Sequence, residues 1–173
     1  ALAFARALGL ETRRVQFTPD TLPSDILGFS VYDKASGRLE YKPGAVMTNL
    51  LLADEINRTS SRTQAALLEA MEERRVTVDG VTHPLPTPFV VLATQNPVGS
   101  AGTQRLPASQ LDRFLVRLSM GYPDRAAQMA ILKERHHADP LDAVRPVTDI
   151  ATLQKLTDEV SAVYIADSVY DYV

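Results

Sequence analysis

The sequence predicts an α/β fold with a parallel sheet, followed by an all-helical part. Two apolar runs, at residues 49–53 and 89–94, lack polar alternation, which is typical of strands buried on both faces of a parallel sheet. An amphipathic helix pattern separates the two runs, and no strand pattern appears after about residue 120. We therefore expect an α/β part over residues 1–121 and a helical part over residues 122–173.

The composition fits one ordinary globular unit and argues against several classes of partner. Of the 173 residues, 45% are apolar and 23% are charged, and the net charge is −3. So mild a charge balance gives no bulk attraction for nucleic acid or for an anionic membrane. The chain has no cysteine, which excludes disulfides and thiolate metal sites and suits the cytoplasm. No apolar run approaches the roughly 18 residues of a membrane span, so we expect no membrane insertion.

Both ends of the chain read as interrupted helices. Residues 1–8 are rich in alanine and leucine and have no N-cap, and Gly9 is a natural residue to end this helix. Residues 165–173 look like a helix that has just begun at Asp167 or Ser168. We therefore expect the chain to be a segment of a longer protein.

Short extended elements are predicted outside the two apolar runs. Residues 14–18 alternate and contain β-branched and aromatic side chains, which favours a strand. Residues 30–41 indicate a hairpin with its turn near Ser36-Gly37, in which we expect the tyrosines to pack: Tyr32 and Tyr41. A second hairpin is predicted over residues 75–86, because Asp79-Gly80 between alternating valines is a type I′ turn signal.

Three helix starts carry capping signals. Ser61 and Gln64 fit an S-x-x-Q capping box in front of the helix between the two apolar runs. Asp124 can cap a helix that runs to about Arg135, and Thr148 can cap a further helix with one apolar face. We expect both of these helices to belong to the helical part.

Two adjacent carboxylates, Asp54 and Glu55, follow the first apolar run. In an open α/β sheet, ligands bind at the edge formed by the carboxyl ends of the strands. Adjacent residues that leave a strand point in different directions. One carboxylate can therefore hold a divalent cation, directly or through water, while the other orients and deprotonates an attacking water. The alternative is a solvated acidic turn.

Asn96 and Arg113 extend this constellation. Asn96 follows the second apolar run, where its neutral amide can bind a phosphate oxygen or the attacking water; the alternative is an Asx-Pro turn with Pro97. Arg113 lies in a half-apolar segment between Asp112 and Phe114, which suits a guanidinium that contacts a phosphate in trans. The alternative is an ion pair between Asp112 and Arg113 on a helix surface.

The remaining polar groups favour ordinary surface roles. We expect the three histidines to be surface residues rather than metal ligands: His83, His136 and His137. The arginines near the acidic pair are expected to form a solvated face with glutamate partners rather than a nucleic-acid contact: Arg58, Arg62, Arg74 and Arg75. A contact of Arg58 with a neighbouring subunit stays open.

Three segments, in this order and spacing, resemble the MoxR family of AAA+ ATPases: NLLLADEINR, VLATQNP and LPASQLDRF. The resemblance covers most of the chain and includes GYPDR at residues 121–125. It implies a partial P-loop NTPase-type parallel-sheet sandwich of the AAA+ class over residues 1–121. It also implies that residues 122–173 are the start of an all-helical lid.

The resemblance implies a role for each candidate residue. Asp54 and Glu55 match the Walker B pair, in which Asp54 holds Mg²⁺ through water and Glu55 activates the catalytic water. Asn96 matches sensor 1. Arg113 matches the arginine finger, which reaches the γ-phosphate of ATP bound by a neighbouring subunit. The implied ligands are therefore ATP and Mg²⁺.

The resemblance also implies an assembly and a task. Residues about 28–44 look like the family's insert in helix 2, and residues about 75–86 look like the hairpin before sensor 1. Such inserts typically face the pore of a ring. The expected protein is a cytoplasmic hexamer that couples Mg-ATP hydrolysis to chaperone-like remodelling or activation of partner proteins. Its expected partners include proteins with von Willebrand factor A domains.

Two nucleotide-binding features of the family are missing from the chain. No glycine is followed by lysine, so the phosphate-binding loop G-x-x-x-x-G-K-[ST] is absent. The sensor 2 arginine of the lid would follow residue 173. We therefore expect these residues alone to bind ATP poorly and to hydrolyse it negligibly.

Other functions stay open at this point. A magnesium-chelatase-like subunit or a nucleic-acid motor would use the same chemistry on another target, although the mild charge argues against the motor. A non-catalytic interaction module would keep the fold without the loop. A missing G-K-[ST] upstream of residue 1 would favour this module.

Overall fold

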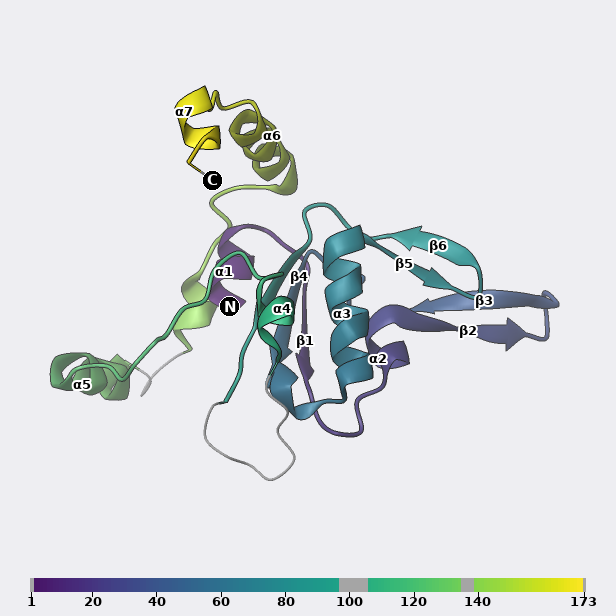
Figure 1. The fold of residues 1–173 in the computed structure, drawn as a ribbon. Helices are drawn as coiled ribbons and strands as arrows, with labels where there is room; N and C mark the ends of the chain where they lie inside the picture. Colours follow the sequence, from purple (N-terminus) through teal and green to yellow (C-terminus); the bar gives the residue numbers. More distant parts are fainter. Residues whose placement is uncertain (1, 97–105, 135–138, 173) are drawn as a thin grey trace.

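The computed structural model describes residues 2–96, 106–134 and 139–172 (Figure 1). Its central sheet has three strands in the order β1-β4-β7, and both neighbouring pairs run parallel. The strands are β1 (Thr12–Gln16), β4 (Leu50–Asp54) and β7 (Val90–Ala93). The prediction of a parallel sheet is confirmed. The strand predicted over residues 14–18 instead begins at Thr12, because its pairing with β4 starts at Thr12 opposite Leu50.

Strand β4 is buried on both faces. Leu50 and Leu51 point to opposite faces and have no exposed surface. Leu51 belongs to a core cluster with residues of helix α3 (Ser61–Glu73), and Leu50 belongs to a second cluster with Ala5 of helix α1 (Leu2–Ala7). Helices therefore cover both faces of the sheet, which explains why the run through β4 has no polar alternation.

Two antiparallel hairpins extend from the sheet side by side (Figure 1). They are formed by β2 (Gly28–Asp33) with β3 (Arg38–Pro43), and by β5 (Arg75–Val78) with β6 (Val81–Pro84). Both hairpins match the sequence predictions. The positive φ angles of Asp79 (49°) and Gly80 (77°) fit the predicted type I′ turn.

An aromatic stack joins the two hairpins. The ring centroids of Tyr41 and His83 lie 3.8 Å apart, and the rings are nearly parallel at 13°. The Tyr41 hydroxyl donates a hydrogen bond to the carbonyl oxygen of Leu27, and burial raises the pKa of Tyr41. Tyr41 therefore packs across to the second hairpin, whereas Tyr32 is exposed.

Among the described residues, the chain after β7 forms helices and no strand. Figure 1 shows α5, α6 and α7 projecting away from the sheet. The helices after β7 are α4 (Ala108–Leu111), α5 (Arg125–Glu134), η2 (Pro140–Ala143), α6 (Ile150–Ser161) and α7 (Asp167–Tyr170). Two further short helices precede α3: α2 (Pro23–Leu27) and η1 (Ile56–Arg58).

Leu153 of α6 packs against the cluster that contains Leu50, which attaches the helical part to the sheet. No described helix is long and apolar enough to cross a membrane.

The predicted capping box of α3 is wrong by one residue. Ser60 is the N-cap, because its backbone is extended and its side-chain oxygen accepts a hydrogen bond from the amide of Thr63. Ser61 is already helical. Gln64 is buried and donates to the carbonyl oxygens of Ile56 and Thr59, so it ties the helix to the preceding turn instead of closing a box.

The predicted cap of α6 is also displaced by one residue. Asp149, and not Thr148, accepts the hydrogen bond from the amide of Thr152 at 2.8 Å, and this bond lowers the pKa of Asp149. Asp124 caps α5 as predicted and accepts from the amide of Ala127 at 2.7 Å. The predicted end of that helix at Arg135 lies outside the described residues.

Gly44 is predicted to be far less replaceable than Gly80. A Cβ at Gly44 would lie 2.3 Å from the carbonyl oxygen of Ile26 and from the amide nitrogen of Gly28. Gly44→Ala should therefore lower the free energy of unfolding by about 3 kcal/mol, at the upper end of the usual cost of overpacking. Gly80→Ala meets open space and should cost about 1 kcal/mol for its positive φ. Urea unfolding of the two variants measures both values, and equal losses would contradict the prediction.

Candidate functional site

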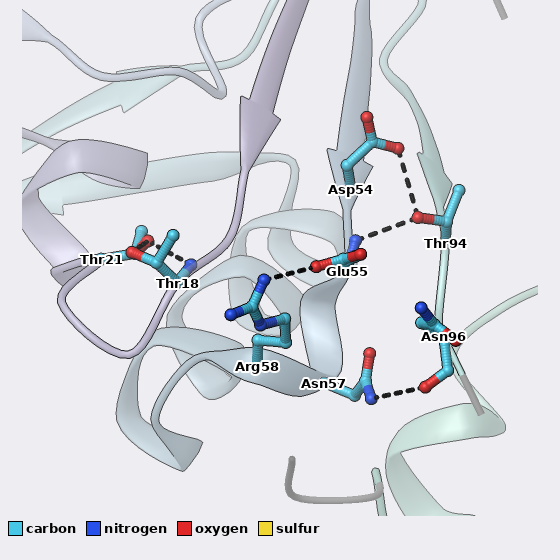
Figure 2. Close-up of polar contacts among 8 residues, drawn as sticks. All are labelled: Thr18, Thr21, Asp54, Glu55, Asn57, Arg58, Thr94 and Asn96. Atoms are coloured by element: carbon cyan, nitrogen blue, oxygen red, sulfur yellow. Dashed lines mark hydrogen bonds and ion pairs between the residues drawn. The ribbon is translucent and has the colours of Figure 1, made fainter. Parts of the chain in front are cut away.

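The carboxyl ends of β4 and β7 bring the predicted polar residues to one edge of the sheet (Figure 2). Asp54 is the last residue of β4, and Glu55 follows it. Thr94 and Asn96 follow β7, which pairs with β4 along its length. Both apolar runs are therefore neighbouring parallel strands that end at this edge.

Glu55, the second of the two acidic residues, has a left-handed backbone conformation. Glu55 has φ 55° and ψ 45°, which turns the chain from β4 into helix η1. This conformation costs a non-glycine residue on the order of 1 kcal/mol, and such strain is concentrated at functional sites. Figure 2 shows the carboxylate of Asp54 directed toward Thr94 and that of Glu55 directed toward Arg58. Asp54 and Glu55 therefore point in different directions, as predicted.

Asp54 is held by the strands on both of its sides. From β1, Nε of Arg14 donates to Oδ2 of Asp54 at 2.6 Å. From the β7 side, the hydroxyl of Thr94 donates to Oδ1 at 3.2 Å. The side chain of Asp54 is only 13% exposed, so both hydrogen bonds act on a largely desolvated carboxylate. The position of this carboxylate is therefore set by β4 itself, by Arg14 of β1 and by the residue that follows β7.

Thr94 and Arg58 fix Glu55. The amide of Glu55 donates to the hydroxyl oxygen of Thr94 at 3.0 Å, so that one hydroxyl contacts both acidic residues. Nη1 of Arg58 donates to Oε2 of Glu55 at 2.9 Å. The second oxygen of the Glu55 carboxylate has lone pairs that can accept a proton from water. The expectation that Arg58 has a glutamate partner is confirmed. The partner is Glu55, the residue predicted to activate the catalytic water.

Asn57 anchors the chain at Asn96. Nδ2 of Asn57 donates to the backbone oxygen of Asn96 at 3.3 Å, and Asn57 is buried. The side chain of Asn96 is exposed at the same edge as the two carboxylates. Pro97, which the alternative Asx-Pro turn needs, lies outside the described residues.

Arg113 lies against a different part of the molecule. Its Nε donates to Oε2 of Glu72 at 2.9 Å, and both side chains are about half exposed. The alternative of an intramolecular ion pair on a helix surface is therefore confirmed, but the acidic partner is Glu72 of α3 and not Asp112. The ion pair lines a cavity of about 310 Å³ together with Ala65, Leu68, Glu69, Glu73 and Gln110. Glu72 belongs to the last turn of α3, whereas Glu55 precedes the first turn, so Arg113 pairs with the end of α3 that is farther from Glu55 along the chain.

Three further candidate groups have structural partners: His83, Arg74 and Arg75. His83 belongs to the stack between the hairpins, and His136 and His137 lie outside the described residues. Arg74 donates to the carbonyl oxygen of Phe89, and Arg75 pairs with Glu73 at 2.8 Å. No three histidine or carboxylate side chains of the described residues are arranged to hold a metal ion.

Sequence reasoning missed three residues of the site: Arg14, Asn57 and Thr94. Arg14 could not be placed because its contact with Asp54 depends on the order of the strands. Thr94 carried a usable signal, since a hydroxyl directly after a buried strand lies at the same edge as the carboxylates. Asp54 offers the carboxylate oxygens that Mg²⁺ prefers, and it fits a site in which water and phosphate oxygens complete the shell.

A family model covers most of the sheet-bearing part of the chain. Residues 1–116 match the family described as "ATPase family associated with various cellular activities (AAA)". The uncharacterized protein YeaC of Bacillus subtilis is 48% identical over 171 residues, which are 99% of this chain and 53% of YeaC. Chaperone MoxR1 of Mycobacterium tuberculosis is 38% identical over 170 residues, which are 98% of this chain and 45% of MoxR1.

A solved structure has the same fold. The crystal structure of a protein from Cytophaga hutchinsonii, described as a candidate ATPase, superimposes with a TM-score of 0.86 at 37% identity. The superposition covers 98% of this chain and 52% of that chain. The chain thus spans about half the length of the relatives it matches.

Replacement of Thr94 should loosen both carboxylates at once. Thr94→Val keeps the shape of the side chain but removes the hydroxyl that contacts Asp54 and the amide of Glu55. We expect a loss of about 1–2 kcal/mol in the free energy of unfolding, because two polar groups lose a partner. Thr94→Ser keeps the hydroxyl and should retain most of this stability. Chemical denaturation compares the variants, and a Thr94→Val protein as stable as Thr94→Ser would contradict the assignment.

Proposed function

Because the chain belongs to the MoxR family of AAA+ ATPases, we propose that its sheet edge is the site of Mg-ATP hydrolysis in the whole protein. The whole protein would use this hydrolysis for chaperone-like remodelling or activation of partner proteins. The observation that carries the proposal is the placement of Asp54, Glu55 and Asn96 at one edge, with the two carboxylates in different directions. A solvated acidic turn would not need a threonine hydroxyl that contacts both acidic residues.

Each residue at the edge has a proposed role. Asp54, the first acidic residue of the Walker B motif, would hold Mg²⁺ through water, and bound Mg²⁺ supplies charge neutralisation of the phosphates. Glu55 would orient the attacking water and take its proton. Asn96, at the sensor 1 position, would hydrogen-bond the γ-phosphate or this water. The phosphate-binding loop is not among residues 1–173, so its residues are not assigned.

Arg113 is proposed to act in trans as the arginine finger. It lies at the far end of α3 from Glu55, so it is badly placed to serve the sheet edge of its own chain. Its ion pair with Glu72 is about half exposed, and such pairs contribute roughly 0–1 kcal/mol. Arg113 could therefore leave Glu72 at little cost when a neighbouring subunit presents a bound phosphate.

The assembly proposed for the whole protein is a hexameric ring in the cytoplasm. Residues 1–121 would form the core of each subunit, and residues 122–173 would begin the lid. The hairpins at about 28–44 and 75–86 would face the pore. Their exposed apolar side chains support contact with partner proteins, among which we include proteins with von Willebrand factor A domains: Phe29, Val31, Tyr32, Leu39 and Val81.

Glu55→Gln should abolish turnover without abolishing ATP binding. The measurement needs a protein that carries the phosphate-binding loop upstream of residue 1. We expect kcat to fall by about 10²-fold or more, because the amide cannot accept the proton of water. Glu73→Gln is the matched control, since Glu73 is an exposed acid at the opposite end of α3. Unchanged turnover in Glu55→Gln would contradict the assigned base, and absence of ATP binding in the parent protein would favour a non-catalytic module.

Arg113→Ala should lower kcat by about 10³-fold, and mixing should partly rescue it. In a mixture of Glu55→Gln and Arg113→Ala subunits, some interfaces combine an intact Glu55 with an intact Arg113. Steady-state ATPase activity of the mixture should therefore exceed that of either variant alone. Arg75→Ala breaks a comparable ion pair with the end of α3 and should change kcat by less than about twofold. A mixture no more active than its components would exclude action in trans.

A further inference from the structure

We propose that Arg14 is a positioning residue that makes cation binding by Asp54 depend on bound nucleotide. The inference rests on the proposed function, because it takes Asp54 as the residue that holds Mg²⁺. It concerns a residue of β1 that has no assigned role in the hydrolysis described above.

The register of the sheet delivers Arg14 to Asp54. Strand β1 pairs with β4 in parallel, with Arg14 opposite Leu52 and Gln16 opposite Asp54. Residues two apart in a strand share a face, so Arg14 and Asp54 lie on the same face of the sheet, one step apart. The side chain of Arg14 is long enough to extend along the sheet to Asp54, and its Nε lies 2.6 Å from Oδ2 of Asp54.

The guanidinium of Arg14 places a positive charge beside the carboxylate of Asp54. The Asp54 side chain is 13% exposed and that of Arg14 is 61% exposed, so the guanidinium lies on the water side of a largely buried carboxylate. A divalent cation that approaches Asp54 without a nucleotide meets this guanidinium within a few ångströms and is repelled. Phosphate groups of a bound nucleotide would add negative charge beside the carboxylate. Their attraction for the cation would then outweigh its repulsion by Arg14.

Arg14 does not have to leave when the cation arrives. A carboxylate has about four lone-pair positions, of which Arg14 and Thr94 use one on each oxygen. The remaining positions can accept hydrogen bonds from water bound to Mg²⁺. Arg14 and Thr94 then keep the carboxylate in place, but only Arg14 adds charge, since Thr94 is neutral. The other arginine at this edge, Arg58, forms its ion pair with Glu55 and not with Asp54.

Binding of Mn²⁺ in the absence of nucleotide tests this role. Mn²⁺ replaces Mg²⁺ at oxygen sites, and free Mn²⁺ is counted directly by electron paramagnetic resonance. In the protein that carries the phosphate-binding loop, Arg14→Gln and Arg14→Met should each bind Mn²⁺ about three- to tenfold more tightly than the parent protein. Arg14→Lys keeps the charge and should stay near the parent value. In the presence of ATP, the difference between the parent and the neutral variants should shrink.

Two controls separate the role of Arg14 from general effects of charge and folding. Arg75→Gln removes the same charge from β5, where Arg75 pairs with Glu73 of α3, and should leave Mn²⁺ affinity unchanged. Asp54→Asn combined with Arg14→Gln should remove the gain, which assigns the bound Mn²⁺ to Asp54. Circular dichroism identifies which of the two neutral variants is folded and can be used.

The outcomes distinguish this inference from the proposed function. If folded neutral variants at Arg14 bind Mn²⁺ no more tightly than the parent protein, or if Arg75→Gln shows the same gain, Arg14 has no specific role. That result would leave the loss of turnover in Glu55→Gln intact. Conversely, a gain at Arg14 together with unchanged turnover in Glu55→Gln would support the cation site and contradict the assigned base.

Discussion

Parallel pairing of β4 with its two neighbours is the constraint on which the rest of the structure depends. The register places Gln16 beside Asp54 and Ala93 beside Ala53, so three strands end at one edge. A slip of one residue would turn Asp54 to the opposite face of the sheet. Burial of β4 on both faces prevents such a slip, because every register change would expose or misplace apolar side chains. Core packing thereby positions polar groups whose own interactions are individually weak.

Elements with a strong period or a specific turn signal could be predicted from the sequence. The two buried strands, the helix between them and the Asp79-Gly80 hairpin all belong to this class, because each pattern is compatible with few backbone conformations. The helix caps were misplaced because Ser60 stands beside Ser61 and Asp149 beside Thr148. All four side chains can accept a hydrogen bond from a helix amide. Backbone angles decide between neighbours, and these follow from tertiary packing that local sequence does not encode.

The candidate site could be predicted only where the signal was local. The two carboxylates and Asn96 each follow an apolar run directly, so the order of residues along the chain was enough to place them. The contact of Arg14 with Asp54 joins residues 40 positions apart, and that of Arg113 with Glu72 joins residues 41 apart. Both contacts depend on which strand or helix becomes a neighbour.

Helix α3 explains why one copy of the chain would be an incomplete catalyst. The helix begins at Ser61, shortly after the proposed base Glu55, and its last turn carries Glu72, which holds the proposed finger Arg113. Leu67 of this helix is fully buried against the sheet. If Arg113 acts in trans as proposed, hydrolysis in the ring would depend on contact between subunits. The Arg113–Glu72 pair is about half exposed and therefore weak, so the proposed contact with a neighbouring subunit would break it at little cost.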